Sequence, residues 1–385
     1  MTLSPEWRFS VYYAALFASI GSIAPFFAVW LDSLGIDAHM IGIIAAAPSV
    51  VMIITTVPIG RWADSLRERR TAIITCNVLI LAAQVMLFWP LDPLLILVVW
   101  TFTGMLMFAK VPVTDAAALS ITHQRNSDFA RVRVFGSLGF AVALAASGYV
   151  YEIIGMAAFV PILCLGNILR LWMSCLLPEG GRRRAEKTGK QAVGDSGSLY
   201  QTGVILTIVA SAIIQSSHAV VYTFGILLWT QLQGLSETTG SLLIAIGVVA
   251  EVLLMWRFTS LTRNMSARGC LLIAAVCGLL RWAILAMSPP LWLLYTAQLM
   301  HAMTFGLTFL ATASFIARRV GETNAARGQG LAAAITTASL ALMTFWAGVL
   351  FDVAGIKLYW LMCGLCGLSV ILLALSYLTS LDEPV

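Results

Sequence analysis

The sequence predicts an all-α membrane protein with twelve transmembrane helices in two pseudo-symmetric bundles of six. Its composition is the first reason: 60% of the 385 residues are hydrophobic and 11% are charged, whereas soluble domains carry roughly 25% charged residues. The spacing of the apolar runs is the second reason. One crossing needs ~20 apolar helical residues, so twelve crossings use about 240 residues and leave no room for a soluble domain.

Charged or Gly- and Pro-rich turns separate the apolar runs. The expected spans lie near 9–32, 40–60, 71–89, 93–120, 129–152, 156–177, 203–232, 236–257, 268–287, 290–317, 326–350 and 356–378. The first run continues past Pro25 to Leu31, so we interpret it as an uncleaved span and not as a signal peptide. Residues 178–200 are polar and glycine-rich. We expect them to connect an N-terminal bundle at 1–177 to a C-terminal bundle at 201–385.

The distribution of basic residues predicts the orientation in the membrane. Nineteen of the 23 lysines and arginines lie at Arg8 or within 61–70, 125–133, 182–190, 257–268 and 318–327, whereas the opposite loops contain only Lys357. By the positive-inside rule, both termini are expected in the cytoplasm of a bacterial inner membrane. The net charge of +5 therefore indicates orientation, and we expect no nucleic-acid partner.

Two short segments recur six spans apart. Trp30-Leu-Asp-Ser-Leu-Gly35 leaves the first span as Trp229-Thr-Gln-Leu-Gln-Gly234 leaves the seventh. Likewise, the fifth span ends on Gly148-Tyr-Val-Tyr-Glu-Ile-Ile-Gly155 and the eleventh on Gly348-Val-Leu-Phe-Asp-Val-Ala-Gly355. Parallel repeats of this kind, which rock about a site near the membrane midplane, are typical of secondary transporters.

Four ionisable residues lie well inside predicted spans: Lys110 and Asp115 in the fourth, Glu251 in the eighth and Arg281 in the ninth. Each costs ~2.5–3.5 kcal/mol to insert at mid-bilayer, so each is a candidate for function. Each half holds one acid and one base, which predicts balanced charges that face a wet cavity. Lys110 and Asp115 lie about 140° apart around a helix, so their partners are left open. Arg170 is expected to reach the cytoplasmic interface.

Polar residues also recur at helical spacing in two other spans. They are Gln215, His218 and Tyr222 in the seventh span, and Gln298, His301, Thr304 and Thr308 in the tenth. A single Gln or Thr in this setting usually forms an interhelical hydrogen bond worth ~0.6 kcal/mol. For the two histidines taken together with Glu251 and Arg281, we favour a role in a cavity.

The loop after the second span reads Gly60-Arg-Trp-Ala-Asp64-Ser-Leu-Arg67-Glu-Arg69-Arg70. It resembles the GxxxDxxxRR-like motif of the major facilitator superfamily (MFS). The resemblance implies a cytoplasmic charge network that latches the two halves in the outward-facing state. The residues assigned to this cytoplasmic gate are Gly60, Asp64, Arg67, Arg69, Arg70, Arg131 and Arg133.

Further motifs resemble the phenylpropionate permease branch, which is related to proton symporters of the lactose permease type. They are Pro112-Val-Thr-Asp115-Ala, Arg131-Val-Arg133-Val-Phe-Gly136-Ser137, Ser217-His218-Ala with Tyr222, Ala250-Glu251-Val, Arg281-Trp282 and Gln298-Leu-Met-His301-Ala. The resemblance implies that Glu251, Arg281 and His301 belong to the coupling and binding network. The lactose-type permeases carry a carboxylate at the position of Thr304.

Together these features predict a secondary active transporter that carries a small organic substrate with protons, and an aromatic carboxylate is the candidate substrate class. Proton coupling is assigned to Glu251, Asp115 and His301, and substrate binding to Arg281, Lys110, His218, Tyr222, Gln215 and Gln298. The alternatives are a proton-driven exporter of the same superfamily, a membrane sensor and a membrane-embedded enzyme. The sequence shows no nucleophile–base or metal-ligand pattern, so we expect no catalysis, cofactor or metal. The expected partners are a small molecule, protons and the bilayer, and we expect a monomer.

Overall fold

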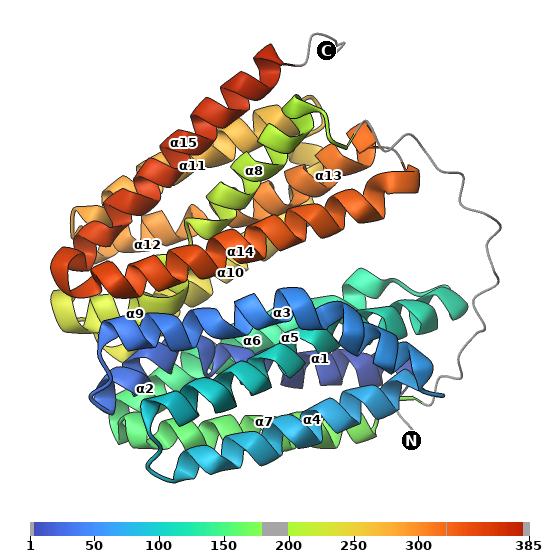
Figure 1. Cartoon of the computed structure of the whole chain (residues 1–385), viewed down its shortest axis with the longest axis vertical. Coiled ribbons are helices and arrows are strands. Elements are labelled where there is room, and N and C mark those ends of the chain that lie inside the picture. Colours follow the sequence, from blue (N-terminus) through green and yellow to red (C-terminus); the bar gives the residue numbers. More distant parts are fainter. Residues whose placement is uncertain (1–3, 179–198, 321, 380–385) are drawn as a thin grey trace. The chain divides into compact units, whose positions relative to one another are not determined.

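The computed structural model describes residues 4–178, 199–320 and 322–379, and these residues form helices and short connections without a β-strand. The chain divides into two compact units (Figure 1). Unit 1 comprises the described residues of Met1–Glu186 together with Thr223–Ala245. Unit 2 comprises the described residues of Lys187–Tyr222 and of Ile246–Val385. Most of the predicted connector lies outside the described residues, so the boundary at 178–200 stays a prediction.

The first half of the chain contains α1–α7, drawn from blue to green in Figure 1. Their bounds are α1 Pro5–Gly21, α2 Phe27–Ser33, α3 Ala38–Ser65, α4 Arg69–Val85, α5 Pro93–Gln124, α6 Phe129–Ile154 and α7 Phe159–Cys175. A short 3₁₀ turn at Ala24–Phe26, which contains Pro25, separates α1 from α2. Proline lacks the backbone N–H that would continue the helix, so the first span is broken there.

The second half contains α8–α15. Their bounds are α8 Thr202–Ser216, α9 Ala219–Gln233, α10 Glu237–Leu261, α11 Ala267–Ala286, α12 Leu291–Leu299, α13 Thr308–Val320, α14 Glu322–Ala354 and α15 Leu358–Leu378. A π-helical turn, Ala302–Leu307, joins α12 to α13 within the tenth span. The seventh span is broken between α8 and α9, like the first between α1 and α2.

Eleven segments among the described residues are long and apolar enough to cross a membrane. The last segment, Arg327–Leu378, contains most of α14 and all of α15. It therefore accounts for two of the predicted spans, and the expectation of an all-α membrane fold with twelve spans is confirmed. The observed ends differ from the expected ones by a few residues, as at Pro5–Ser33 and Thr202–Gln233.

The two halves repeat the same helix packing. In the first half, α1 packs against α6 and α7, while α4 packs against α5 and α7. In the second half, α8 packs against α14 and α15, while α11 packs against α13 and α15. Counted as spans, the pairs one–five, one–six, three–four and three–six of the first half recur six spans later. The pseudo-symmetry expected from the short repeated segments is therefore present in the packing.

The repeated segments also share their backbone conformation. Gly35 and Gly234, which end the first pair of segments, have φ angles of 76° and 63°. Gly155 and Gly355, which end the second pair, have φ angles of 83° and 50°. A side chain disfavours this left-handed region and glycine does not, so the same residue type closes the same turn in both halves.

Candidate functional site

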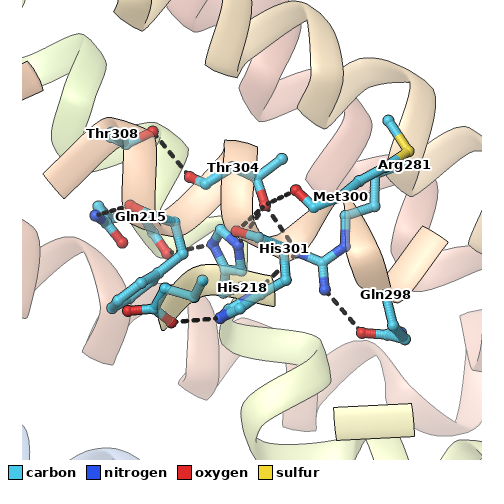
Figure 2. Close-up of polar contacts among 10 residues, drawn as sticks. Gln215, His218, Arg281, Gln298, Met300, His301, Thr304 and Thr308 are labelled. Atoms are coloured by element: carbon cyan, nitrogen blue, oxygen red, sulfur yellow. Dashed lines mark hydrogen bonds and ion pairs between the residues drawn. The ribbon is translucent and has the colours of Figure 1, made fainter. Parts of the chain in front are cut away.

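Arg281 lies at the centre of a buried polar cluster in unit 2. Its side chain comes from α11 and is 0% exposed. Nη1 donates to Thr304 Oγ1 at 2.8 Å and Nη2 donates to Gln298 Oε1 at 2.9 Å (Figure 2). The guanidinium carbon lies 4.5 Å from the centre of the Trp282 ring. The ninth and tenth spans thus hold this cation through neutral hydrogen-bond acceptors and an aromatic face.

His301 connects Arg281 to Glu251. Its Nδ1 lies 3.3 Å from Arg281 Nη1, and its Nε2 lies 3.2 Å from Glu251 Oε2. Arginine only donates, so Nδ1 accepts and the imidazole proton sits on Nε2, from which it is donated to the carboxylate. Glu251 and Arg281 therefore interact through a neutral histidine and not by direct contact.

His218 occupies the other side of the cluster, at the break between α8 and α9. Its Nδ1 lies 3.1 Å from the backbone oxygen of Gln215, and a carbonyl oxygen only accepts, so Nδ1 carries the proton. Its Nε2 then accepts from the hydroxyl of Thr304 at 3.0 Å. Thr304 accepts from Arg281 and donates to His218, so one hydroxyl joins the seventh, ninth and tenth spans.

Local backbone features bring these side chains together. The π-helical turn Ala302–Leu307 starts directly after His301, and such turns occur frequently at functional sites. On α10, a Cβ at Gly247 would lie 3.0 Å from the backbone oxygen of Gln298 and 3.1 Å from His301 Cβ. The absence of a side chain there allows α10 to approach the tenth span closely enough for Glu251 to reach His301.

The side chains of the cluster differ in their exposure to solvent. The Arg281 side chain is 0% exposed, that of His301 is 8% exposed and that of Glu251 is 16% exposed. Gln215 and Tyr222 are also partly exposed. Gln215 donates to the Phe305 backbone oxygen at 3.3 Å, and the Tyr222 ring lies 5.5 Å from that of His218. The carboxylate is thus the end of the relay that is nearest to the surface of the unit.

Unit 1 arranges its charges differently. Lys110 on α5 is 1% exposed, and its Nζ donates to Asn77 Oδ1 at 2.5 Å. Asp115, five residues further along α5, accepts from the hydroxyl of Tyr13 at 2.5 Å and lies 3.9 Å from Arg133 Nε. The partners of Lys110 and Asp115, which the sequence left open, thus lie on different neighbouring helices. Lys110 has a neutral partner.

The prediction that Arg170 reaches the cytoplasmic interface is wrong. Its side chain is 0% exposed and does not extend toward an interface. Nη1 donates to Ser19 Oγ at 3.1 Å and contacts Met107 Sδ at 3.2 Å. Its position near the end of α7 suggested an interfacial side chain, but its face of the helix is turned toward α1 and α5. Unit 1 therefore buries two cations.

The residues assigned to the cytoplasmic gate lie together at one end of unit 1. Asp64 Oδ1 lies 3.2 Å from Arg69 Nη2, and Arg69 Nη1 also donates to the Ala116 backbone oxygen at 3.3 Å. Arg70 donates to the backbone oxygen of Cys175 at 2.6 Å. Two other members make weaker contacts, since Arg131 lies 3.9 Å from Asp128 and Arg133 stacks over Phe17. Arg67 is exposed, and Gly60 has open space where a side chain would be.

Sequence reasoning did not assign a role to several residues that the structure places at these sites. Thr304 appeared in the polar stripe of the tenth span, and its spacing of three residues from His301 was the available signal. Asn77 and Tyr12 had no such signal, because a single polar residue in an apolar run is common. Their importance depends on which helices face one another.

A fold of twelve spans in two repeated halves, with buried ionisable clusters in its membrane-spanning part, is typical of a secondary transporter. The chain belongs to the MFS_1-like family, whose model matches residues 6–362. It is thus an MFS transporter and not an enzyme.

Individual relatives support the same assignment. The chain is 29% identical over 91% of its length to a probable 3-phenylpropionic acid transporter of Escherichia coli K12, of which 92% is covered. It is 25% identical to a maltose permease of Geobacillus stearothermophilus, with 95% of this chain and 93% of that protein covered. Among solved structures, the nucleoside transporter NupG matches with a TM-score of 0.82 at 15% identity, over 99% of this chain and 100% of that one. This last similarity shows the fold alone.

Proposed function

We propose that the protein is a proton-coupled symporter that carries a small aromatic carboxylate across the bacterial inner membrane, with both termini in the cytoplasm. The observation that carries the proposal is the relay of Arg281, His301 and Glu251. It ends on a carboxylate that is 16% exposed, where a proton can be taken up and released. The similarity to a probable 3-phenylpropionic acid transporter supports the substrate class.

The relay provides a way to couple the proton to an anion. With Glu251 ionised, its charge offsets that of Arg281 through His301. When the Glu251 carboxylate takes up a proton, its charge disappears and the cluster gains one positive charge. A substrate carboxylate restores neutrality, and moving a neutral set of groups through a low-dielectric region costs less than moving a net charge. Proton and anion are then favoured to bind together.

The remaining assignments follow from this scheme. His218, Gln215, Tyr222 and Gln298 line the cluster and supply hydrogen bonds or an aromatic face to the substrate. Asp115, which is held by Tyr13 and Arg133, is a second candidate for the proton. Two of the cations predicted from the sequence, Arg281 and Lys110, are candidates to receive the carboxylate. The motif after the second span acts as the cytoplasmic gate, and the two bundles alternate access as a monomer.

The test is uptake of radiolabelled 3-phenylpropionate into proteoliposomes with an imposed pH gradient. We expect an inward-directed proton gradient to drive accumulation and a protonophore to abolish it. Glu251→Gln should lose gradient-driven uptake but keep substrate exchange, because the amide cannot release a proton. Asp115→Asn tests whether this second candidate carries the proton. The matched control is Asp352→Asn, which removes an exposed carboxylate of unit 2.

Proton symport through these residues is wrong if uptake persists under the protonophore and in both Glu251→Gln and Asp115→Asn. Gradient-driven loss of substrate from preloaded vesicles, without uptake, supports the exporter alternative.

A further inference from the structure

Arg170 presents an unused hydrogen-bonding edge inside unit 1. Its Nη1 is engaged by Ser19 and Met107, whereas its Nε and Nη2 have no hydrogen-bond partner although both atoms are buried. Nε and Nη2 form the side of a guanidinium that projects two parallel N–H groups. This fork matches the two oxygens of a carboxylate, and such bidentate pairs are the strongest hydrogen-bonded contacts that arginine makes.

Lys110 lies on the face of α5 that Arg170 contacts. Arg170 contacts Met107, and Met107 precedes Lys110 by three residues on α5, so both side chains of α5 share one helix face. Lys110 contacts Asn77, whose amide group in turn donates to the Tyr12 hydroxyl at 3.4 Å. Two buried cations from different helices thus have only neutral partners, and both are associated with the same face of α5.

The described residues supply no anion to this pair. Asp115 is held by Tyr13 and Arg133, and no carboxylate of the described residues lies within salt-bridge distance of Lys110 or Arg170. Two like charges that are desolvated together repel one another, and each lacks the compensation that water would give. Such an arrangement is favourable when an anion joins it.

Arg281 in unit 2 lacks this capacity. Both of its Nη atoms are engaged, by Thr304, His301 and Gln298, and only its Nε has no partner. A carboxylate that bound Arg281 in the bidentate manner would have to displace the relay. Arg170 can accept the same ligand without giving up its contact with Ser19.

We propose that Arg170 and Lys110 form the binding site for the substrate carboxylate, with Arg170 Nε and Nη2 as a bidentate clamp and Lys110 Nζ as a third donor. This inference rests on the proposed function and refines it. Of the two candidate cations named above, Lys110 is thereby assigned to the carboxylate and Arg281 to the proton relay. His218, Gln215, Tyr222 and Gln298 then support the relay and not the substrate. The neutrality argument holds for the chain as a whole and not for one cluster. The site selects organic monocarboxylates over neutral analogues.

The surroundings of the pair suit an aromatic or aliphatic substituent. Met107 packs against the apolar core cluster of unit 1, which includes Tyr12 and Leu16. A carboxylate on the cations would therefore leave its hydrocarbon part among aromatic and aliphatic side chains, as in most small-molecule sites. Since both cations are closed to solvent here, the ligand enters when the surrounding helices separate during alternating access.

The test is a binding assay on the purified full-length protein in detergent. The ligands are benzoate, phenylacetate, 3-phenylpropionate and 4-phenylbutyrate, each paired with its uncharged amide. The affinity ratio of acid to amide reports the carboxylate site. We expect the acids to bind better by about tenfold or more, and the ratio to fall toward one in Arg170→Gln and Lys110→Gln.

Arg170→Lys sharpens the assay, because lysine keeps the charge but cannot present two parallel donors. We expect it to lose most of the acid preference as well. Lys357→Gln, which removes an exposed cation outside the site, is the control and should keep the preference. The melting temperature of each variant without ligand shows whether it is folded.

The proposal is overturned if no acid binds better than its amide, or if the folded Arg170 and Lys110 variants keep the full acid preference. A different result contradicts the proposed function, namely uptake that does not depend on the proton gradient. If Arg170 binds carboxylates but uptake needs no protons, only the proposed function is contradicted. If protons drive uptake of a neutral substrate, only the carboxylate site is contradicted.

Discussion

The buried cations of the two units have different surroundings. In unit 2, Arg281 is offset by Glu251 through His301, and its two Nη atoms are engaged by neighbouring side chains. In unit 1, Lys110 and Arg170 are both buried with neutral partners, and Arg170 Nε and Nη2 make no hydrogen bond. A cation with an internal counter-ion responds to protons, whereas uncompensated cations respond to anions. On the function proposed above, the two units therefore divide the tasks of a symporter between them.

The largest effect should come from giving unit 1 its own anion. In Asn77→Asp, a carboxylate oxygen takes the place of the amide oxygen that lies 2.5 Å from Lys110 Nζ. We expect carboxylate uptake to fall by roughly a hundredfold, because the internal anion competes with the substrate. The folded protein should gain stability, since a charge-assisted hydrogen bond contributes about 1.5–3 kcal/mol. Uptake and thermal melting of the same preparation check both changes.

A loss of uptake together with a loss of stability would indicate simple misfolding. Asn77→Gln, which is neutral, is the companion variant and should reduce uptake far less than the aspartate does.

Arg281→Lys should have the next largest effect. One ammonium cannot reproduce contacts to Thr304, His301 and Gln298, and each buried partner left unsatisfied costs about 1–3 kcal/mol. We expect gradient-driven uptake to fall by about thirtyfold or more, while the acid-to-amide affinity ratio stays close to that of the unmodified protein. A collapse of that ratio in Arg281→Lys would place the carboxylate in unit 2 and contradict the division of tasks.

Thr304→Val should act on the relay alone. The substitution keeps the shape of the side chain but removes the hydroxyl that accepts from Arg281 and donates to His218. We expect about a tenfold loss of proton-driven uptake, from one buried network hydrogen bond. Exchange of substrate without a gradient should change little. Equal losses in both assays would assign Thr304 to substrate binding.

Arg69→Gln should give the smallest change in stability. Its partner Asp64 and Arg69 itself have side chains that are 61% and 41% exposed, and exposed ion pairs contribute about 0–1 kcal/mol. If this pair is part of the gate, uptake should still fall by a few fold through the conformational cycle. Melting temperature and initial uptake rate, measured side by side with Arg61→Gln, separate the two effects.

Much of the fold was predictable because hydropathy and turn chemistry are local. Apolar runs of sufficient length must form helices in a membrane, since every backbone polar group has to be satisfied within the span. The repeated segments at Gly35 and Gly234 also marked equivalent turns correctly, because only glycine tolerates the left-handed backbone there without strain. Ionisable residues in the spans identified the candidate sites, because placing a charge inside a membrane is energetically costly.

The partners of those residues were not predictable, because they depend on the rotation of each helix in the packed bundle. Arg170 was expected at an interface from its depth, but its face of α7 is turned toward Ser19 and Met107. Lys110 and Asp115 share a helix and still have different partners. Composition and local pattern thus set the helices, their repeat and the cost of each buried charge. The packing decided which charges are compensated, because that depends on side chains brought together from distant parts of the chain.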